Sequence, residues 1–317
     1  MGETSKEPGS KRRSSFTDTV RQAGQAVSNL EQKIEKRLTV LWHEVEEWQR
    51  DNHYITSGYR PQSNSYLGSL GSLGYLHNES VNIWTHGIGA VVAIVSGIWL
   101  HNVLRPRYET ASQEDIFAFS CFFFGATCCL GMSATYHAIS NHSPEVSRFG
   151  NQLDYLGIVS LIWGSFIPSI YYGFQGDVFW IRTYWSMITT IGAGCAMVSI
   201  NPKFRTPKWR PFRAGMFTAM GISAVIPVLH GIIMFGIPQM NRSISLPHVL
   251  TQGILYIVGA GLYASRIPER FSPGTFDIWG SSHQIFHVLI LIAAATHLVG
   301  LLHAFDYKHE GPGVQLW

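Results

Sequence analysis

The chain has few charged residues and few cysteines, and both deficits restrict what it can be. Only 14% of its 317 residues are Asp, Glu, Lys or Arg, whereas 46% are hydrophobic. This balance is typical of a membrane protein and argues against one soluble domain. The 4 cysteines fall within long apolar stretches, where they act as small apolar residues, so we expect no disulfide framework. Aromatic and basic residues are not interleaved, and no nucleic-acid partner is expected.

Seven apolar stretches are long enough to cross a membrane as helices, since a span needs about 20 apolar residues. The sequence therefore predicts an all-α membrane protein with seven transmembrane helices, integral to the plasma membrane or the endoplasmic reticulum. We expect a transmembrane domain over residues 79–303, a juxtamembrane region over 17–78 and a short outer tail over 304–317. The stretches run approximately over Val81–Val103, Ile116–Ile139, Leu153–Phe174, Val178–Ile200, Ala214–Phe235, Val249–Ala264 and Ile278–Leu302.

Lysine and arginine are concentrated before the first stretch and in the loops after the fourth and sixth stretches. Positive residues near spans are retained on the cytosolic side. The N-terminus is therefore predicted to be cytosolic and, after seven spans, the C-terminus to lie outside. This is the reverse of the orientation of rhodopsin-like receptors and argues against that class. The basic residues of the two loops are Lys203, Arg205, Lys208, Arg210, Arg213, Arg266 and Arg270.

The chain before the first stretch changes composition twice. Residues 1–16 are rich in Ser, Gly, Lys and Arg, with too few apolar groups to fold alone, and we expect a disordered basic tail. From Thr17 to Arg50 apolar residues recur every three or four positions, which predicts an amphipathic helix. Its charges are of both signs, so we expect it to pack against the bundle, a protein partner or a second copy of the chain.

Two histidines in the last apolar stretch have the spacing of a metal site. His283 and His287 are four residues apart, so on a helix their imidazoles share one face and can bind one ion. The predicted topology places His137, at the end of the second stretch, near the cytosolic face of the membrane, level with His283 and His287. Asp154, at the start of the third stretch, enters from the same face. Ionisable groups inside a membrane are costly and usually mark function. The alternative is a polar network that holds the second, third and seventh helices together.

The donor set favours zinc over other common metals. Imidazoles with an oxygen donor suit zinc better than magnesium or calcium, which prefer all-oxygen shells. Three histidine ligands leave a fourth position for water, as in catalytic zinc sites. The His-Gln-Ile-Phe-His run has Gln284 where zinc proteases have a glutamate base, so Asp154 is the nearest candidate for that role. Ser133, one helical turn before His137, could hydrogen-bond the water or the substrate.

Other polar and small residues of the apolar stretches are expected to be structural. Glu79, Asn82 and His86 recur at three and four residues, so they share a helix face and are expected to brace the first span. His77 and His142 are substitute ligands without a partner at helical spacing. Packing roles are expected for His86, His230 and His297. Small-residue pairs that would let helices approach closely are Gly192, Gly194, Gly259 and Gly261.

Several motifs recur in order in one known family. They are Ser133 to His137 with Leu153-Asp154-Tyr155, Arg266-Ile-Pro-Glu-Arg270, Phe276-Asp-Ile-Trp279 with Ser282-His-Gln-Ile-Phe-His287, Trp48-Gln-Arg-Asp-Asn52, and Glu79, Asn82 and His86. In these motifs the chain resembles the progestin and adipoQ receptor family, from about residue 40 to about residue 303. That family contains the adiponectin receptors, haemolysin III-type proteins, and fungal membrane proteins tied to zinc and sterol homeostasis, which the chain resembles most.

The resemblance implies a seven-helix fold with a cytosolic N-terminus and zinc held by His137, His283 and His287, with Asp154 and Ser133 beside it. It also implies ceramidase-like hydrolysis of a lipid amide, with a membrane lipid or ceramide-like substrate. Two functions stay open: a zinc-dependent lipid amide hydrolase, and a receptor or regulatory membrane protein whose zinc is purely structural. Zinc transport is a weaker third hypothesis, because the predicted cluster stays in one leaflet.

Overall fold

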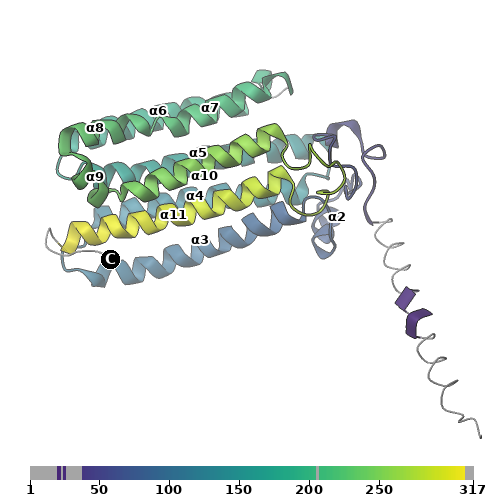
Figure 1. Ribbon diagram of the computed structural model, residues 1–317, viewed down its shortest axis with the longest axis horizontal. Coiled ribbons are helices and arrows are strands. Elements are labelled where there is room, and N and C mark those ends of the chain that lie inside the picture. Colours follow the sequence, from purple (N-terminus) through teal and green to yellow (C-terminus); the bar gives the residue numbers. More distant parts are fainter. Residues whose placement is uncertain (1–19, 23, 26–37, 205–206, 311–317) are drawn as a thin grey trace, which may run out of the picture.

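The computed structural model describes residues 20–22, 24–25, 38–204 and 207–310, and its long helices form one elongated bundle (Figure 1). Within these ranges no β-strand occurs, only an isolated bridge between Val40 and Tyr59. The expected all-α class is confirmed. The long helices are α3 (Ser80–Arg107), α4 (Gln113–Ile139), α5 (Pro144–Gly173), α6 (Val178–Ile200), α7 (Arg210–Ile222), α8 (Val225–Phe235), α10 (Leu246–Ser265) and α11 (Ser282–Glu310). Short helices are η1 (Glu47–Gln49), α2 (Tyr66–Gly71), η2 (Ser72–Gly74), η3 (Pro202–Phe204), η4 (Pro207–Trp209) and α9 (Ile237–Ser243).

Most of the long helices have the length and composition of membrane spans. α7 and α8 together make one such segment. α6 coincides with the fourth predicted stretch and packs beside α5 (Figure 1). It is not one of the segments with the length and composition of a membrane span. Length and composition thus support six of the seven expected spans, and the chain is a multi-pass membrane protein. The six segments are Ser80–Leu104, Gln113–Ile139, Pro144–Gly173, Pro211–Phe235, Leu246–Ser265 and Ser282–Glu310.

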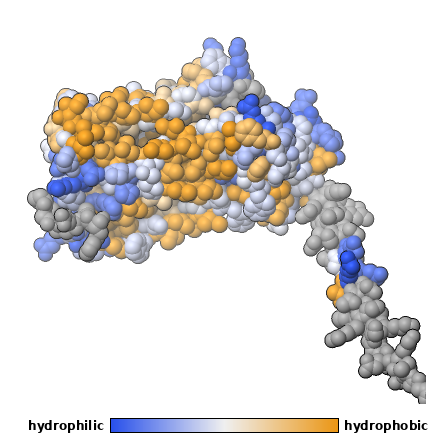
Figure 2. Space-filling view, in the orientation of Figure 1, coloured by the Kyte–Doolittle hydropathy of each residue, from blue (hydrophilic) through white to orange (hydrophobic). Residues whose placement is uncertain are grey.

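The surface of the bundle suits contact with lipid. Figure 2 shows a broad apolar band between two more polar ends. On α3, Val91, Val95, Ile98 and Trp99 are each at least 60% exposed. So much contiguous apolar surface is unfavourable in water, while in a bilayer a helix satisfies its own backbone and can present apolar side chains to lipid. This face of α3 is therefore lipid-facing.

The sequence itself marks where two central helices begin. Before α4, the Ser112 hydroxyl accepts the Asp115 N–H at 3.4 Å and the Asp115 carboxylate accepts the Ser112 N–H at 2.9 Å, which makes a capping box. Before α5, the Ser143 hydroxyl accepts the Val146 N–H at 3.4 Å, and Pro144 occupies the first helical position. These caps fix the starts of α4 and α5.

Three of the expected stretches differ clearly in their bounds. α5 begins at Pro144, nine residues before the predicted Leu153. α11 continues to Glu310, inside the predicted outer tail, because Lys308 near its end forms an ion pair with buried Asp115 at 2.9 Å. The fifth expected stretch is broken between α7 and α8. Pro227, just after the break, has no N–H to donate to the carbonyl of Ser223, which favours an interruption there.

The closest helix approach lies between α4 and α5. At Gly125 and Gly164 an added Cβ would lie 2.4 and 2.5 Å from backbone atoms of the neighbouring helix. The expectation of close contacts at Gly194 and Gly261 is wrong, because nothing lies within 4 Å of a Cβ at either position. A glycine spacing in the sequence does not reveal which helix face meets a neighbour.

Residues 38–79 form a cap on one end of the bundle, called here the juxtamembrane cap. The predicted helix Thr17–Arg50 is wrong from residue 39 onward, where the chain forms turns and the short η1. Val40 instead exchanges backbone hydrogen bonds with Tyr59 at 2.7 and 3.1 Å. Val45, Ile55 and Tyr59 bury their side chains together. The predicted basic tail 1–16, most of residues 17–37 and residues 311–317 lie outside the described residues, and so does any contact they make with a partner.

Candidate metal centre

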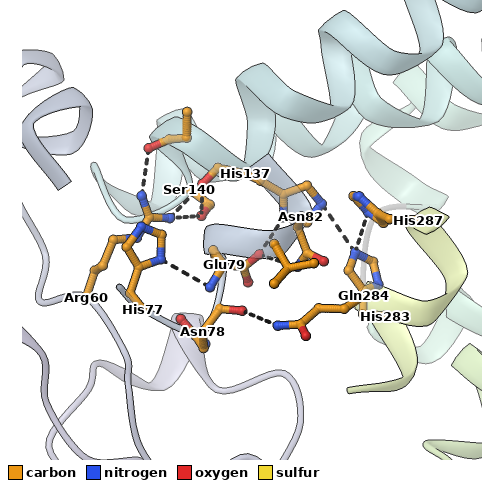
Figure 3. Close-up of polar contacts among 12 residues, drawn as sticks. Arg60, His77, Asn78, Glu79, Asn82, His137, Ser140, His283, Gln284 and His287 are labelled. Atoms are coloured by element: carbon orange, nitrogen blue, oxygen red, sulfur yellow. Dashed lines mark hydrogen bonds and ion pairs between the residues drawn. The ribbon is translucent and has the colours of Figure 1, made fainter. Parts of the chain in front are cut away.

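Three histidine side chains converge at the capped end of the bundle (Figure 3). His137 comes from the last turn of α4, and His283 and His287 come from the first turns of α11. The Nε2 atom of His283 lies 3.2 Å from Nε2 of His137 and 3.1 Å from Nε2 of His287. One nitrogen of each ring lies within 4.8 Å of the others. The structure therefore brings together the three histidines that the sequence nominated, and we call them the histidine triad.

Arg60 of the juxtamembrane cap holds the end of α4 that carries His137. Its buried guanidinium donates to the carbonyl oxygens of His137 at 2.6 Å and Ala138 at 2.9 Å. The hydroxyls of Ser72 and Ser140 accept its other bonds at 2.9 and 3.0 Å. The last carbonyls of a helix lack partners within it, so a cation there satisfies them and complements the helix dipole. Burial lowers the pKa of Arg60 to about 10, which leaves it charged at neutral pH.

Glu269 holds the start of α11. Its buried carboxylate accepts the Ser282 N–H at 2.7 Å and the Asn52 side-chain amide at 3.0 Å, and it also accepts the Ser282 hydroxyl. A carboxylate at a helix N-terminus satisfies a free N–H and is favoured by the helix dipole. Because Ser282 directly precedes His283, this contact sets the start of the helix that carries two members of the triad.

Gln284 stands where zinc proteases have a glutamate base, and its contacts are structural. Its side-chain oxygen accepts the Gly280 N–H at 2.6 Å. Its nitrogen donates to the carbonyl oxygens of Ile278 at 2.9 Å and Asn78 at 3.2 Å. The buried amide is thus committed to backbone partners around the start of α11 (Figure 3), which agrees with the expectation that a general base comes from another segment.

Glu79, the residue before α3, contacts the triad directly. Its Oε2 lies 2.7 Å from Nδ1 of His137 and also accepts the side-chain amide of Asn82 at 2.7 Å. A carboxylate at Nδ1 makes that nitrogen the donor, so the Nε2 lone pair of His137 is left for a metal. The sequence predicted that Glu79 braces the first span. The structure shows that it also orients a triad histidine.

The spacing of the triad fits a tetrahedral metal ion. Zinc–imidazole bonds of 2.0–2.1 Å at a tetrahedral angle place two nitrogens about 3.3 Å apart, close to the 3.1 and 3.2 Å seen here. Hydrogen bonds among neutral rings do not fit as well. With the His137 proton on Nδ1 for Glu79, its Nε2 can only accept, so Nε2 of His283 would have to donate to His137 and could not also accept from His287. A metal at the centre satisfies all three nitrogens.

Asp154 and Ser133 lie next to the triad. Asp154 on α5 is close enough to His137 and to the Ser133 hydroxyl to interact with both. Ser133 on α4 is buried, and its Oγ makes no hydrogen bond of standard geometry to any described residue. The structure thus places a carboxylate and a hydroxyl beside His137.

The other histidines have different partners. His77 is buried beside Arg60, and desolvation and the charge of Arg60 lower its pKa to about 3. The ring of His142 packs on Tyr66, with ring centroids 4.3 Å apart. Neither is a member of the triad. His86 packs as expected, because its ring stacks on His287 at 3.7 Å.

Sequence reasoning missed Arg60 and Glu269. Arg60 was counted only as one of the positive residues before the first span, and Glu269 only as part of the Arg266-Ile-Pro-Glu-Arg270 motif. No local capping pattern indicated Glu269, because it lies 13 residues before the Ser282 N–H that it accepts. No pattern could have paired Arg60 with the end of α4, because the two are 77 residues apart.

Comparison with known proteins agrees with this architecture. A model of the haemolysin-III-related family matches residues 74–298. The chain is 41% identical over 278 residues to the ADIPOR-like receptor IZH2 of Saccharomyces cerevisiae, with 87% of each protein covered. It is 41% identical over 292 residues to the adiponectin receptor protein of Drosophila melanogaster, covering 90% of this chain and 65% of that one. It is 36% identical over 289 residues to heptahelical transmembrane protein 1 of Arabidopsis thaliana, covering 89% and 86%. The chain therefore belongs to the haemolysin-III-related family, which it shares with relatives named as adiponectin-receptor-like and as progestin and adipoQ receptor-like proteins.

Proposed function

We propose that the protein is a zinc-dependent hydrolase of a lipid amide, ceramidase-like, acting in lipid and zinc homeostasis. The observation that carries this proposal is the convergence of three imidazoles, with Nε2 of His283 at 3.1 and 3.2 Å from Nε2 of the other two, and with Asp154 and Ser133 beside them. A closed structural zinc site has four protein ligands, whereas three protein ligands leave a position for water or substrate. Three histidines are the complete metal-ligand group found among the described residues.

The donor set favours zinc as the ion that His137, His283 and His287 would hold. Imidazole is a preferred zinc ligand, while magnesium and calcium favour oxygen. Zinc supplies Lewis acidity, which polarises a carbonyl and lowers the pKa of a coordinated water to about 7. Glu79 contributes by keeping the proton of His137 on Nδ1, which orients its ring towards the ion.

The remaining residues have roles in positioning and proton transfer. Asp154 accepts a proton from the attacking water, because its carboxylate comes from α5 and faces the triad side of α4. The Ser133 hydroxyl, which lies beside the Asp154 carboxylate, donates a hydrogen bond to the substrate oxygen or the water. The buried position of Ser133 and the triad limits access by bulk water, which suits a substrate that enters from the lipid.

The topology that goes with this function has seven spans. α6 would be the fourth span, because it packs along α5 at the length of its neighbours, and an Arabidopsis thaliana relative is named heptahelical. The lysines and arginines of the loops after α6 and α10 would then hold the triad end of the bundle in the cytosol, with the C-terminus outside. The membrane would be the plasma membrane or the endoplasmic reticulum.

The test is metal analysis and turnover of a fluorescent ceramide by detergent-purified protein. Wild type, His283→Ala, Asp154→Ala and His230→Ala are compared. His230 is the matched control, since it is a helix histidine that hydrogen-bonds Tyr184 at 2.8 Å, away from the triad. We expect about one zinc per chain and turnover in wild type and His230→Ala, loss of both in His283→Ala, and loss of turnover with zinc retained in Asp154→Ala.

Two outcomes contradict the proposal. Turnover that survives in His283→Ala would separate catalysis from the triad. The absence of turnover with every lipid amide tried, in protein that holds stoichiometric zinc, would exclude hydrolysis while leaving the metal site in place.

That second outcome would support the other candidate, a receptor or regulatory membrane protein with a structural zinc. Two relatives are named receptors, which favours this candidate. The triad joins the end of α4 to the start of α11, so an ion there would cross-link two helices that are 146 residues apart at the His137–His283 contact. Loss of zinc would then lower the thermal stability of the bundle and change no reaction.

A further inference from the structure

A series of buried polar atoms without partners runs through the bundle away from the triad. Four side chains on α5, α10 and α11 present a buried nitrogen or oxygen that makes no hydrogen bond to any residue the structure describes. Two of them, Ser165 and His297, are themselves at least 91% buried. The four atoms are Ser165 Oγ, Gln252 Oε1, Tyr256 OH and His297 Nε2.

Three of the four residues lie at about one depth in the membrane, and Tyr256 lies between them and the triad. On α11, His297 is ten residues beyond His287, and on α5, Ser165 is eleven beyond Asp154, so both lie about 15 Å deeper than the triad. α10 runs the opposite way. Counting back from Tyr263, whose ring centroid is 4.8 Å from that of His283, Tyr256 lies about 10 Å deep and Gln252 about 16 Å deep.

Contacts place these residues on the inward faces of their helices. The His297 ring lies 5.2 Å from that of Phe122 and interacts with the backbone of Ser165. Tyr256 packs against the buried cluster shared by α4, α5 and α11. Gln252 is one helical turn from Tyr256, so it shares that face. The four polar atoms are therefore held between helices rather than turned towards lipid.

At the end of the bundle opposite the triad, the series meets a cluster of Ser245, His248 and His303. The buried Ser245 hydroxyl lies 2.7 Å from Nδ1 of His248 and 3.5 Å from Nδ1 of His303. His248 is one turn before Gln252 on the same face of α10. Both histidine side chains are only partly buried, so this group is open to the surroundings. We call the line from Ser245 through Gln252, His297 and Tyr256 to the triad the polar track.

We propose that the polar track holds a chain of water molecules that connects the far end of the bundle to the histidine triad. Buried polar groups are almost always hydrogen-bonded, and internal water is the usual partner when no protein group is in reach. Lipid tails would leave all four atoms unpaired. A divalent cation would need several ligand atoms clustered around one point, and among the described residues the only such group of His, Cys, Asp or Glu is the triad.

Such a chain gives the triad a supply of water and protons from the side opposite the juxtamembrane cap. The buried Ser133 hydroxyl lies between Tyr256 and the triad in depth, and its contact with Asp154 continues the track to that carboxylate. The water chain does not depend on the proposed hydrolysis. It would equally serve a triad that holds a structural metal.

Radiolytic labelling of the purified protein in ¹⁸O-water tests the proposal, because hydroxyl radicals formed from bound water oxidise the side chains beside it. Tyr184 is the matched control. It is a buried membrane-helix tyrosine whose hydroxyl is already paired with His230 at 2.8 Å. We expect Tyr256 and His297 to take up label at least about fivefold faster than Tyr184, as bound water lies beside them. Uptake by both at the Tyr184 rate would overturn the proposal.

A second comparison separates a connected chain from isolated waters. Gln252→Leu removes one polar step, and we expect the labelling of His297 to fall severalfold. Ser169→Ala on α5 is the control, because the Ser169 hydroxyl already donates to the Ser165 carbonyl at 2.9 Å within its own helix. His297 labelling that is equal in wild type and Gln252→Leu, in protein of unchanged helix content, would refute the connection.

Discussion

Replacement of Glu79 is the sharpest perturbation of the site that leaves all three triad histidines in place. The Glu79 carboxylate lies 2.7 Å from Nδ1 of His137 and also accepts the Asn82 amide at 2.7 Å. Glu79→Gln keeps an oxygen that can accept one of these bonds but removes the charge. Glu79→Ala removes the acceptor and frees the His137 ring to rotate or to carry its proton on Nε2, where the metal would bind.

The expected loss follows from the role of the contact. Carboxylates that orient a ligating histidine contribute 10- to 100-fold to metal affinity, which equals about 1.4–2.7 kcal/mol. A charged hydrogen bond is roughly twice as strong as a neutral one. We therefore expect zinc to bind about tenfold more weakly to Glu79→Gln and up to about 100-fold more weakly to Glu79→Ala.

The assay is competition for zinc between the detergent-purified protein and a chromogenic chelator. Glu145→Gln is the control, because Glu145 is an exposed carboxylate that pairs with Arg148 at 2.8 Å and contacts no triad histidine. Its affinity should equal that of wild type. Unchanged zinc affinity in Glu79→Ala would show that the carboxylate does not orient His137, and the reasoning from geometry would fail.

Three further predictions concern the stability of the bundle. Glu269→Ala leaves the buried Ser282 N–H unpaired, and we expect a loss of about 1–3 kcal/mol in chemical denaturation; a midpoint equal to that of wild type would contradict the capping role. The pKa of buried His77 is lowered to about 3, so as the pH falls below about 6.5 this histidine is protonated in the unfolded chain but not in the folded one. The free energy of unfolding should therefore drop by about 2 kcal/mol between pH 7 and 5. The drop should be smaller in His77→Asn. Gly164→Ala should lower the free energy of unfolding by about 1–3 kcal/mol, and with it the melting temperature, by forcing α4 and α5 apart. Gly194→Ala, with nothing within 4 Å of its Cβ, should lower the melting temperature little. Equal shifts in both variants would refute the close approach.

Much of the site could be predicted from sequence because its signals are local or topological. The four-residue spacing of His283 and His287 fixes their common helix face whatever the tertiary structure. Four apolar stretches lie between His137 and His283, and this even number of crossings places both at one end of the bundle. The structure brings these histidines within hydrogen-bond distance, with Asp154 and Ser133 adjacent.

The parts that could not be predicted depend on contacts between distant segments. The spacing of Leu41, Val45 and Trp48 at four and three residues suits a helix. Pairing of Val40 with Tyr59 and burial of Val45 against Ile55 favour turns instead. Helix propensity and apolar periodicity say nothing about these contacts with a distant segment. The end of α11 is a similar case, because the ion pair of Lys308 with Asp115 extends the helix beyond its apolar residues.

The central claim is that His137, His283 and His287 together bind one metal ion. X-ray absorption at the zinc edge of the purified wild-type protein tests it most directly. The account predicts bound zinc with about three imidazole nitrogens at 2.0–2.1 Å and a lighter oxygen contribution. A sulfur shell, fewer than two imidazoles, or well-folded protein without bound zinc would contradict it.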